Sequence, residues 1–144
     1  MEKLNVASTY DGMKLPFSLE AEQSVLGAIL LDSSCIDKVA EILPRPEYFH
    51  LGNHKLIYET LLDMFTQGRT IDFVTLLEEL KKNSVFNDSN GKTYLMELAQ
   101  IVPSISNVEN YARIVRDNYD VRTLIITARD IIEDATQGTY DASV

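Results

Sequence analysis

The sequence predicts an all-α protein in which a compact head of about five or six helices is followed by one long helix. Apolar residues recur at three- and four-residue spacing in most segments from position 18 onward. The 144 residues include only six glycines and four prolines, and no segment alternates apolar and polar residues as a half-buried strand would. From position 106 to position 137 the chain contains neither Gly nor Pro, which favours a single long helix.

The first helix of the head is expected to begin after Ser18, a residue type preferred as an N-cap. Glu20 and Glu22 suit the positive end of this helix, where acidic residues are usually dipole partners on a solvated surface. Gly27 lowers the helix propensity at mid-helix and therefore predicts the close approach of a second helix. The apolar stripe consists of Val25, Leu26, Ile29 and Leu30.

Four more helices are expected in the head, and each is bounded by residues that start or stop helices. Residues 83–91 are polar and are expected to form a loop, and Pro46–Phe49 is expected to form one helical turn. The four helices are Cys35–Leu43 before Pro44, Asn53–Gln67 before Gly68, a helix that begins after the cap Asp72, and Tyr94–Val102 after the cap Thr93.

The long helix is expected to begin at a capping box, with Ser106 as the cap and Glu109 three residues later. Gly138 supplies the stop, and a helix of this span is roughly 46 Å long, more than a small head covers. Its distal half carries a broad apolar band, which must pack on another protein helix rather than stay in water. The band consists of Val121, Leu124, Ile125, Ala128, Ile131, Ile132 and Ala135.

The charge balance argues against nucleic-acid binding by this chain. Only 13 basic residues stand against 22 acidic ones, so the formal charge is −9 and no basic excess is available for phosphates. No apolar run is long enough to span a membrane, and the polar residues 1–14 do not resemble a signal peptide. Cys35 is the single cysteine, is expected to pack as a small apolar residue, and fits a reducing, cytoplasmic location.

Three patterns that resemble catalytic or ligand sites have simpler explanations. Gly91-Lys92-Thr93 resembles the end of a phosphate-binding loop, but Phe86 stands where that motif needs glycine and no strand is expected upstream. His50 and His54 have the four-residue spacing of a helical zinc site, yet Gly52 lies between them and no cysteine partner is near. No nucleophile, base and acid fall into a convincing pattern. We therefore expect no catalytic, cofactor or metal residues in this chain.

Several segments of the chain form an ordered set: Leu19–Asp32 (LEAEQSVLGAILLD), His54–Tyr58 (HKLIY), Gly68 with Ile71–Leu76 (IDFVTL), Gly91 with Tyr94–Ala99 (YLMELA), Pro103, and Asn107–Val115 (NVENYARIV) with Arg122. Together these segments resemble the N-terminal part of DnaB-family replicative DNA helicases. Each segment alone is a weak match, but their order and spacing are specific, and the resemblance covers about residues 16–137.

The resemblance implies a bacterial protein with a tail at residues 1–15, a head at 16–104, the first arm of a helical hairpin at 105–138, and a truncated start of the second arm at 139–144. It implies self-association into dimers through the hairpins, a hexameric collar in the full-length protein, and docking of a DnaG-type primase in the primosome. ATP and Mg²⁺ would belong to a motor domain outside this chain, so the chain itself is not expected to be an enzyme.

The resemblance also assigns residues to these contacts. Primase binding is expected at Glu20, Tyr94, Ile125 and Ile131, and self-association at Val121, Leu124, Ala128, Ile132 and Ala135. The alternative interpretation is a stand-alone helical adaptor or regulator that binds another protein helix to helix. A third hypothesis, a nucleotide site at Gly91-Lys92-Thr93, is disfavoured by the motif departures above.

Overall fold

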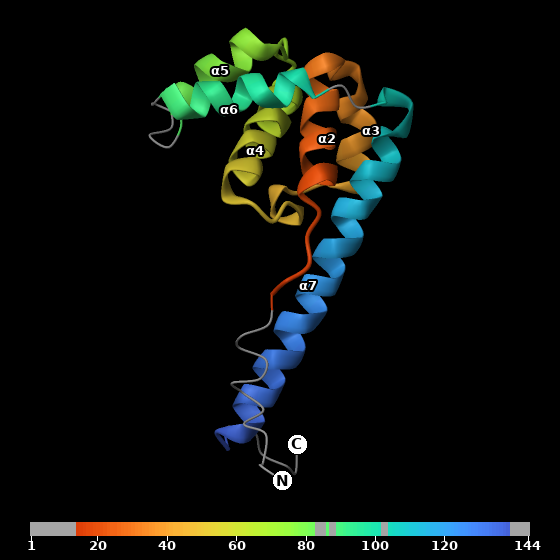
Figure 1. Ribbon diagram of the computed structural model, residues 1–144, viewed down its shortest axis with the longest axis vertical. Helices are drawn as coiled ribbons and strands as arrows, with labels where there is room; N and C mark the ends of the chain where they lie inside the picture. The colour runs from red at the N-terminus through yellow and green to blue at the C-terminus, as the bar shows by residue number, and fades with distance from the viewer. Residues whose placement is uncertain (1–13, 83–85, 87–88, 102–103, 139–144) are drawn as a thin grey trace.

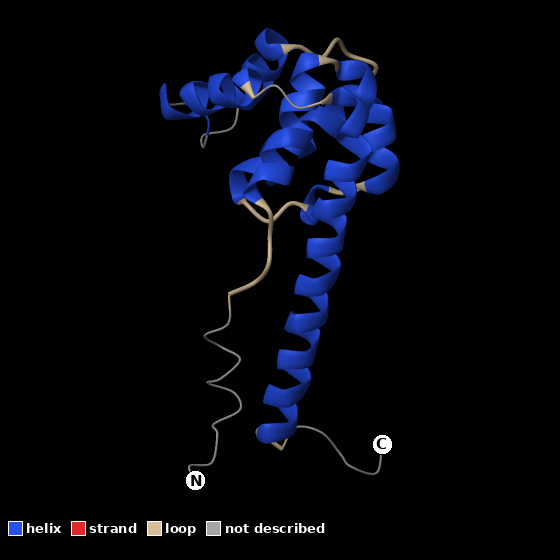
Figure 2. Ribbon diagram, turned by 45° about the vertical axis from the view of Figure 1, so that its right-hand side comes forward, coloured by secondary structure: helices blue, strands red, loops and turns tan. Residues whose placement is uncertain are grey.

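The computed structural model describes residues 14–82, 86, 89–101 and 104–138, and all regular structure in these ranges is helical (Figures 1 and 2). The predicted all-α head followed by a long helix is confirmed. The helices are α2 (Leu19–Leu31), α3 (Ile36–Ile42), α4 (Gly52–Thr66), α5 (Phe73–Lys81), α6 (Ser89–Gln100) and α7 (Val108–Thr136), with 3-10 turns at Ser33–Cys35, Pro46–Tyr48 and Ile105–Asn107.

Helix α2 lies at the centre of the head and packs against α4, α6 and α7 (Figure 1). Its close neighbour α6 leaves no room for a side chain at Gly27, because a Cβ there would lie 2.9 Å from the carbonyl oxygen of Leu98. The close helix–helix approach predicted from Gly27 is therefore confirmed. The largest fully buried side chains include Leu26 and Ile29 of α2, Leu43, Phe49, Tyr58 and Leu61.

Most of the predicted helix boundaries in the head are correct. Ser18 caps α2 and accepts a hydrogen bond from the Ala21 backbone N–H at 3.1 Å. Asp72 caps α5 in a reciprocal capping box with Thr75. Gly68 has a φ of 68° after α4, the left-handed conformation in which glycine ends helices.

Two predicted helix starts are wrong. Helix α7 begins at Val108 after a 3-10 turn, and Ser106 bonds to the Ser104 hydroxyl rather than capping the helix. Helix α6 begins at Ser89, so Gly91 lies in its first turn rather than in a loop, and Thr93 lies inside the helix rather than capping it. The Phe86 ring packs against Gly91, where a Cβ would lie 2.8 Å from the ring. This packing gives Gly91 a structural role that needs no nucleotide.

Helix α7 is fixed to the head by hydrogen bonds and ring contacts along its first half. Arg116 donates a 2.9 Å hydrogen bond to the carbonyl oxygen of Ile42 at the end of α3. The Tyr119 ring lies 4.5 Å from that of Tyr48. Arg122 donates to the carbonyl oxygens of Pro16 and Tyr48, each at 2.9 Å. The remainder of α7 projects beyond the head (Figures 1 and 2).

Candidate protein-interaction site

The projecting half of α7 carries an exposed apolar stripe. Leu124 is 69% exposed, Ile131 51% and Val121 46%, which are high values for large aliphatic side chains. Ala128 and Ala135 are exposed as well, and Ile125 and Ile132 are partly buried. We call these residues the α7 stripe: Val121, Leu124, Ile125, Ala128, Ile131, Ile132 and Ala135.

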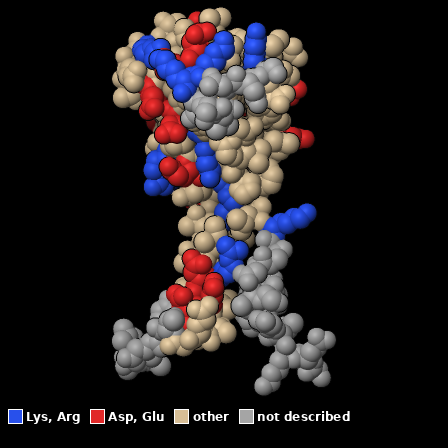
Figure 3. Space-filling view, turned by 90° about the vertical axis from the view of Figure 1, so that its left-hand side faces the viewer, with Lys and Arg blue, Asp and Glu red and all other residues tan. Residues whose placement is uncertain are grey.

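The α7 stripe and the head lie on opposite sides of the helix. At about 100° per residue, Val115 and Arg122, which are buried against the head, lie a third of a turn or more away from Leu124 and Ala128. The head therefore cannot cover the stripe without detaching from α7. Figure 3, which shows the side of the molecule that is at the left in Figure 1, has acidic side chains gathered near the distal end of the helix. The projecting half is thus amphipathic.

The four residues expected to bind a primase fall into two pairs. Glu20 is exposed on the first turn of α2, and Tyr94 lies over the same end of α2, where its hydroxyl accepts a 3.4 Å hydrogen bond from Gln23. Ile125 and Ile131 belong to the α7 stripe. The first pair is therefore on the head and the second on the projecting helix.

Tyr94 is held by a buried network that centres on Glu22. The Glu22 carboxylate accepts hydrogen bonds from His54 Nδ1 at 2.7 Å and from the backbone N–H groups of His50 at 2.8 Å and Leu51 at 3.4 Å. Nε2 of His54 bonds to the Tyr94 hydroxyl, and the two rings stack with centroids 5.8 Å apart. Glu22 is 1% exposed and His54 0%. The network ties α2, α4 and α6 together and fixes the Tyr94 ring.

The hydrogen-bonded chain from Glu22 through His54 to Tyr94 resembles a catalytic relay, but its properties are those of a structural network. Burial is the largest effect on Tyr94 and raises the pKa of its hydroxyl, so the group stays protonated near neutral pH. An activated nucleophile needs the opposite shift, toward the deprotonated form. The arrangement can position the partly buried tyrosine ring for a contact, but it does not activate the hydroxyl as a nucleophile.

The burial of Glu22 contradicts the expectation that this residue is a dipole partner on the solvated surface. The signal that identifies it is spacing, because Glu22 lies three, four and seven residues before Val25, Leu26 and Ile29. It therefore shares the buried face of α2, whereas Glu20 does not. His54, at the start of α4, is fully buried as well.

Other candidate residues show no reactive arrangement. Cys35 is buried, and this burial raises the pKa of its thiol to about 11, so it is not a thiolate at neutral pH. His50 stacks on Phe17 with ring centroids 4.5 Å apart.

No group of three possible metal ligands occurs among the described residues. In the same part of the chain no helix has the length and apolar character needed to cross a membrane.

These features define a class of protein: an α-helical domain whose small head carries a projecting helix with one exposed apolar face. The family model described as "DnaB-like helicase N terminal domain" matches residues 14–117. The chain belongs to this family. The resemblance seen in the sequence is thereby confirmed.

Relatives and a solved structure agree with this assignment. The chain is 42% identical over 119 residues to the replicative DNA helicase DnaB of Geobacillus stearothermophilus, and 38% identical over 122 residues to that of Pasteurella multocida. These matches cover 83% and 85% of this chain but only 26% of each relative. The crystal structure of the N-terminal domain of DnaB helicase from Mycobacterium tuberculosis superposes with a TM-score of 0.82 at 33% identity. That match covers 90% of this chain and 92% of the other.

Proposed function

We propose that this chain is a non-catalytic collar domain of a replicative DNA helicase, which assembles with further copies and presents a docking surface for a DnaG-type primase. The observation that carries the proposal is the α7 stripe, exposed on the side of the helix that faces away from the head. An apolar face of this length in a soluble chain is typical of a helix–helix interface. ATP hydrolysis and DNA translocation would belong to parts of a longer protein, since this chain spans about a quarter of the curated relatives it matches.

The fixed head and the projecting helix support a scaffold role. Arg116, Tyr119 and Arg122 attach the first half of α7 to three separate parts of the head, so the projecting half has a defined direction. A rigid arm with an apolar face is suited to pair with a like arm, because little conformational entropy is lost on association. The partly buried Tyr94 ring is likewise held in place by hydrogen bonds to His54 and Gln23.

Self-association is expected to depend on Leu124, the most exposed side chain of the α7 stripe. Replacing Leu124 with Glu should weaken dimerisation by about tenfold or more, because a charge would be buried at the helix–helix contact. Light scattering over a concentration series measures the effect. The matched control is Val74→Glu, since Val74 is 66% exposed on α5 of the head. A monomeric wild-type chain at all concentrations, or equal effects of both variants, would contradict the prediction.

Primase docking is expected to depend on Ile125 and Ile131. Truncating either to Ala should weaken binding of the C-terminal domain of a DnaG-type primase by about tenfold, the loss typical of an aliphatic anchor at an interface. Isothermal titration calorimetry measures the affinity. The control is Asp130→Ala, because Asp130 is exposed and lies about 100° around α7 from Ile131 and about 140° from Ile125. Unchanged binding in both isoleucine variants would show that the primase docks elsewhere. Loss of binding in the Asp130 variant as well would point to a general change in α7.

A further inference from the structure

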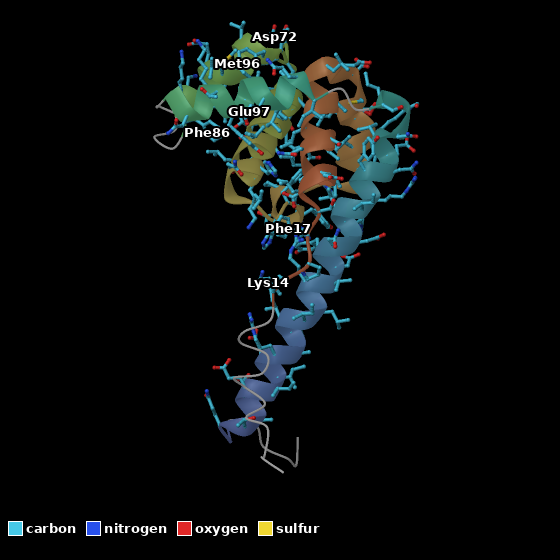
Figure 4. The ribbon with its side chains drawn as sticks, in the orientation of Figure 1. Lys14, Phe17, Asp72, Phe86, Met96 and Glu97 are labelled. Carbon is cyan, nitrogen blue, oxygen red and sulfur yellow. The ribbon has the colours of Figure 1, made fainter. Side chains whose placement is uncertain are left out.

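A cavity of about 330 Å³ lies at the junction where α7 leaves the head. We call it the junction cavity; Leu15 of the segment that leads into α2, Phe49 and Lys55 of the head, and Arg122 and Ile126 of α7 are among the residues that line it. Figure 4 shows Phe17 of the same leading segment at the base of the head, beside α7. Three parts of the fold therefore converge on this cavity, which is on the head side of α7 and distinct from the α7 stripe.

The junction cavity contains a buried cation without an ion-pair partner. Arg122 is 5% exposed, and its guanidinium donates to the carbonyl oxygens of Pro16 and Tyr48. It forms no salt bridge with any carboxylate in the described part of the chain. Two carbonyl dipoles leave most of the charge uncompensated, and a guanidinium has five N–H donors. An anion that entered the cavity would complete the set of partners of Arg122.

The charges around the junction cavity are mainly positive. Lys55 is an exposed residue that lines the cavity, and its ammonium group makes no ion pair with a described residue. His50 also lines it, and its pKa is lowered by burial and then by Arg122, so the ring is neutral near neutral pH. Burial lowers the pKa of Arg122, and the negative charge of Glu22 offsets part of this lowering. The Glu22 oxygens, however, bond to His54 and to two backbone N–H groups. Glu47 is the one acidic residue that lines the cavity, and its side chain is exposed.

The remaining walls restrict the kind of anion. Leu15, Phe49 and Ile126 line the cavity with apolar side chains. The Arg122 guanidinium carbon lies over the Tyr119 ring, 5.8 Å from the ring centroid. A phosphate dianion would leave several of its oxygens against these apolar walls, at a high desolvation cost. A carboxylate has two oxygens in one plane, which match the guanidinium fork, and an apolar stem behind it would contact the carbon walls.

We propose that the junction cavity binds a carboxylate carried on a short apolar stem, with Arg122 as its charge partner and Lys55 at the entrance. A glutamate side chain of a protein segment and a small organic acid share this chemistry. The volume is near the lower end of ligand pockets, so the occupant is a single small group rather than a nucleotide.

The test is a titration of the ¹⁵N-labelled chain followed by backbone amide and arginine Nε chemical shifts. The probes are sodium hexanoate, hexan-1-ol, inorganic phosphate, and a blocked short peptide with glutamate between two leucines. Hexanoate is expected to shift the amides of Thr123 and Ile126 and the Nε of Arg122 in a saturable way. Hexan-1-ol lacks the charge and phosphate lacks the stem, so each should bind about tenfold more weakly.

Variants locate the site on the structure. Arg122→Gln removes the charge and is expected to weaken hexanoate binding by about tenfold or more, whereas Arg129→Gln, on α7 outside the cavity lining, should leave it unchanged. Circular dichroism checks that Arg122→Gln is folded. If Arg122→Gln is not folded, Thr123→Trp replaces it as the test variant. Thr123 is exposed and lines the cavity, so a tryptophan there would fill the cavity without removing a hydrogen bond.

Each result has a defined meaning. Equal binding of hexan-1-ol and hexanoate, tighter binding of phosphate, or unchanged binding in Thr123→Trp would overturn the proposal. Hexanoate binding that is lost in Thr123→Trp supports it. Tighter binding of the peptide than of hexanoate would further identify a protein side chain as the source of the carboxylate, and the reverse order would identify a free organic acid.

Discussion

Replacing Glu22 with Ala is expected to destabilise the chain by about 3–5 kcal/mol, because three hydrogen-bonding groups of the head would lose their acceptor. The Glu22 carboxylate accepts three hydrogen bonds in a site that is 1% exposed. Its removal would leave His54 Nδ1 and two backbone N–H groups without partners away from water, and each unsatisfied group costs about 1–3 kcal/mol.

Glu20 provides a matched control two residues earlier on the same helix turn. It is exposed, so Glu20→Ala should change the free energy of unfolding by no more than about 0.5 kcal/mol. Urea unfolding followed by circular dichroism at the helix band measures both values. Equal small effects would mean that the network around Glu22 does not stabilise the head. A large effect at Glu20 would mean that dipole or capping interactions of the first turn dominate.

Replacing Gly27 with Leu is expected to destabilise the chain by about 3 kcal/mol, near the upper end for overpacking a core. Leu has a higher helix propensity than Gly by nearly 1 kcal/mol, so the local effect on α2 alone would be stabilising. The tertiary contact reverses the sign, because the Cβ would lie 2.9 Å from the Leu98 carbonyl oxygen and 3.4 Å from that of Ile101. Helices α2 and α6 would have to separate to admit the side chain.

Gly52 is the control for this substitution, since a Cβ there would have no neighbour within 4 Å. Gly52→Leu should therefore change stability by about 0.5 kcal/mol or less. Thermal and urea unfolding of the two variants provide the comparison. A stabilised Gly27→Leu chain would contradict the close packing of α2 against α6. A loss at Gly52 as large as that at Gly27 would point to an effect of the exposed leucine itself.

Helix ends set by short-range interactions were predictable from the sequence. Ser18 and Asp72 bond to backbone N–H groups three residues away, and Gly68 adopts a positive φ that other residues resist. These interactions involve neighbours in the chain, so the residue type is sufficient to identify them. The exception is Ser106, which has the right residue type but bonds to Ser104 while a 3-10 turn displaces the start of α7.

Burial of polar groups depends on more than neighbours in the chain: spacing can place a residue on the inner face of a helix, but the partners that satisfy it come from other elements. Glu22 and Glu20 have the same side chain in the same helix turn, yet only Glu22 meets α4 and the loop before it. The same holds for Arg122, which the sequence presents as one of several charged residues on α7. The structure buries it between the segment at Pro16 and the turn at Tyr48.

The two candidate sites also differ in how much of each could be predicted from the sequence. By itself the sequence determined the all-α class, the long helix and its apolar band, because periodicity along one helix is a property of that helix alone. Only the tertiary structure decided which side of α7 the head occupies, and therefore that Leu124 stays exposed while Arg122 is buried beside a cavity. The physical reason is that the burial of a residue depends on every element that packs around it, and segments remote in the chain supply those elements.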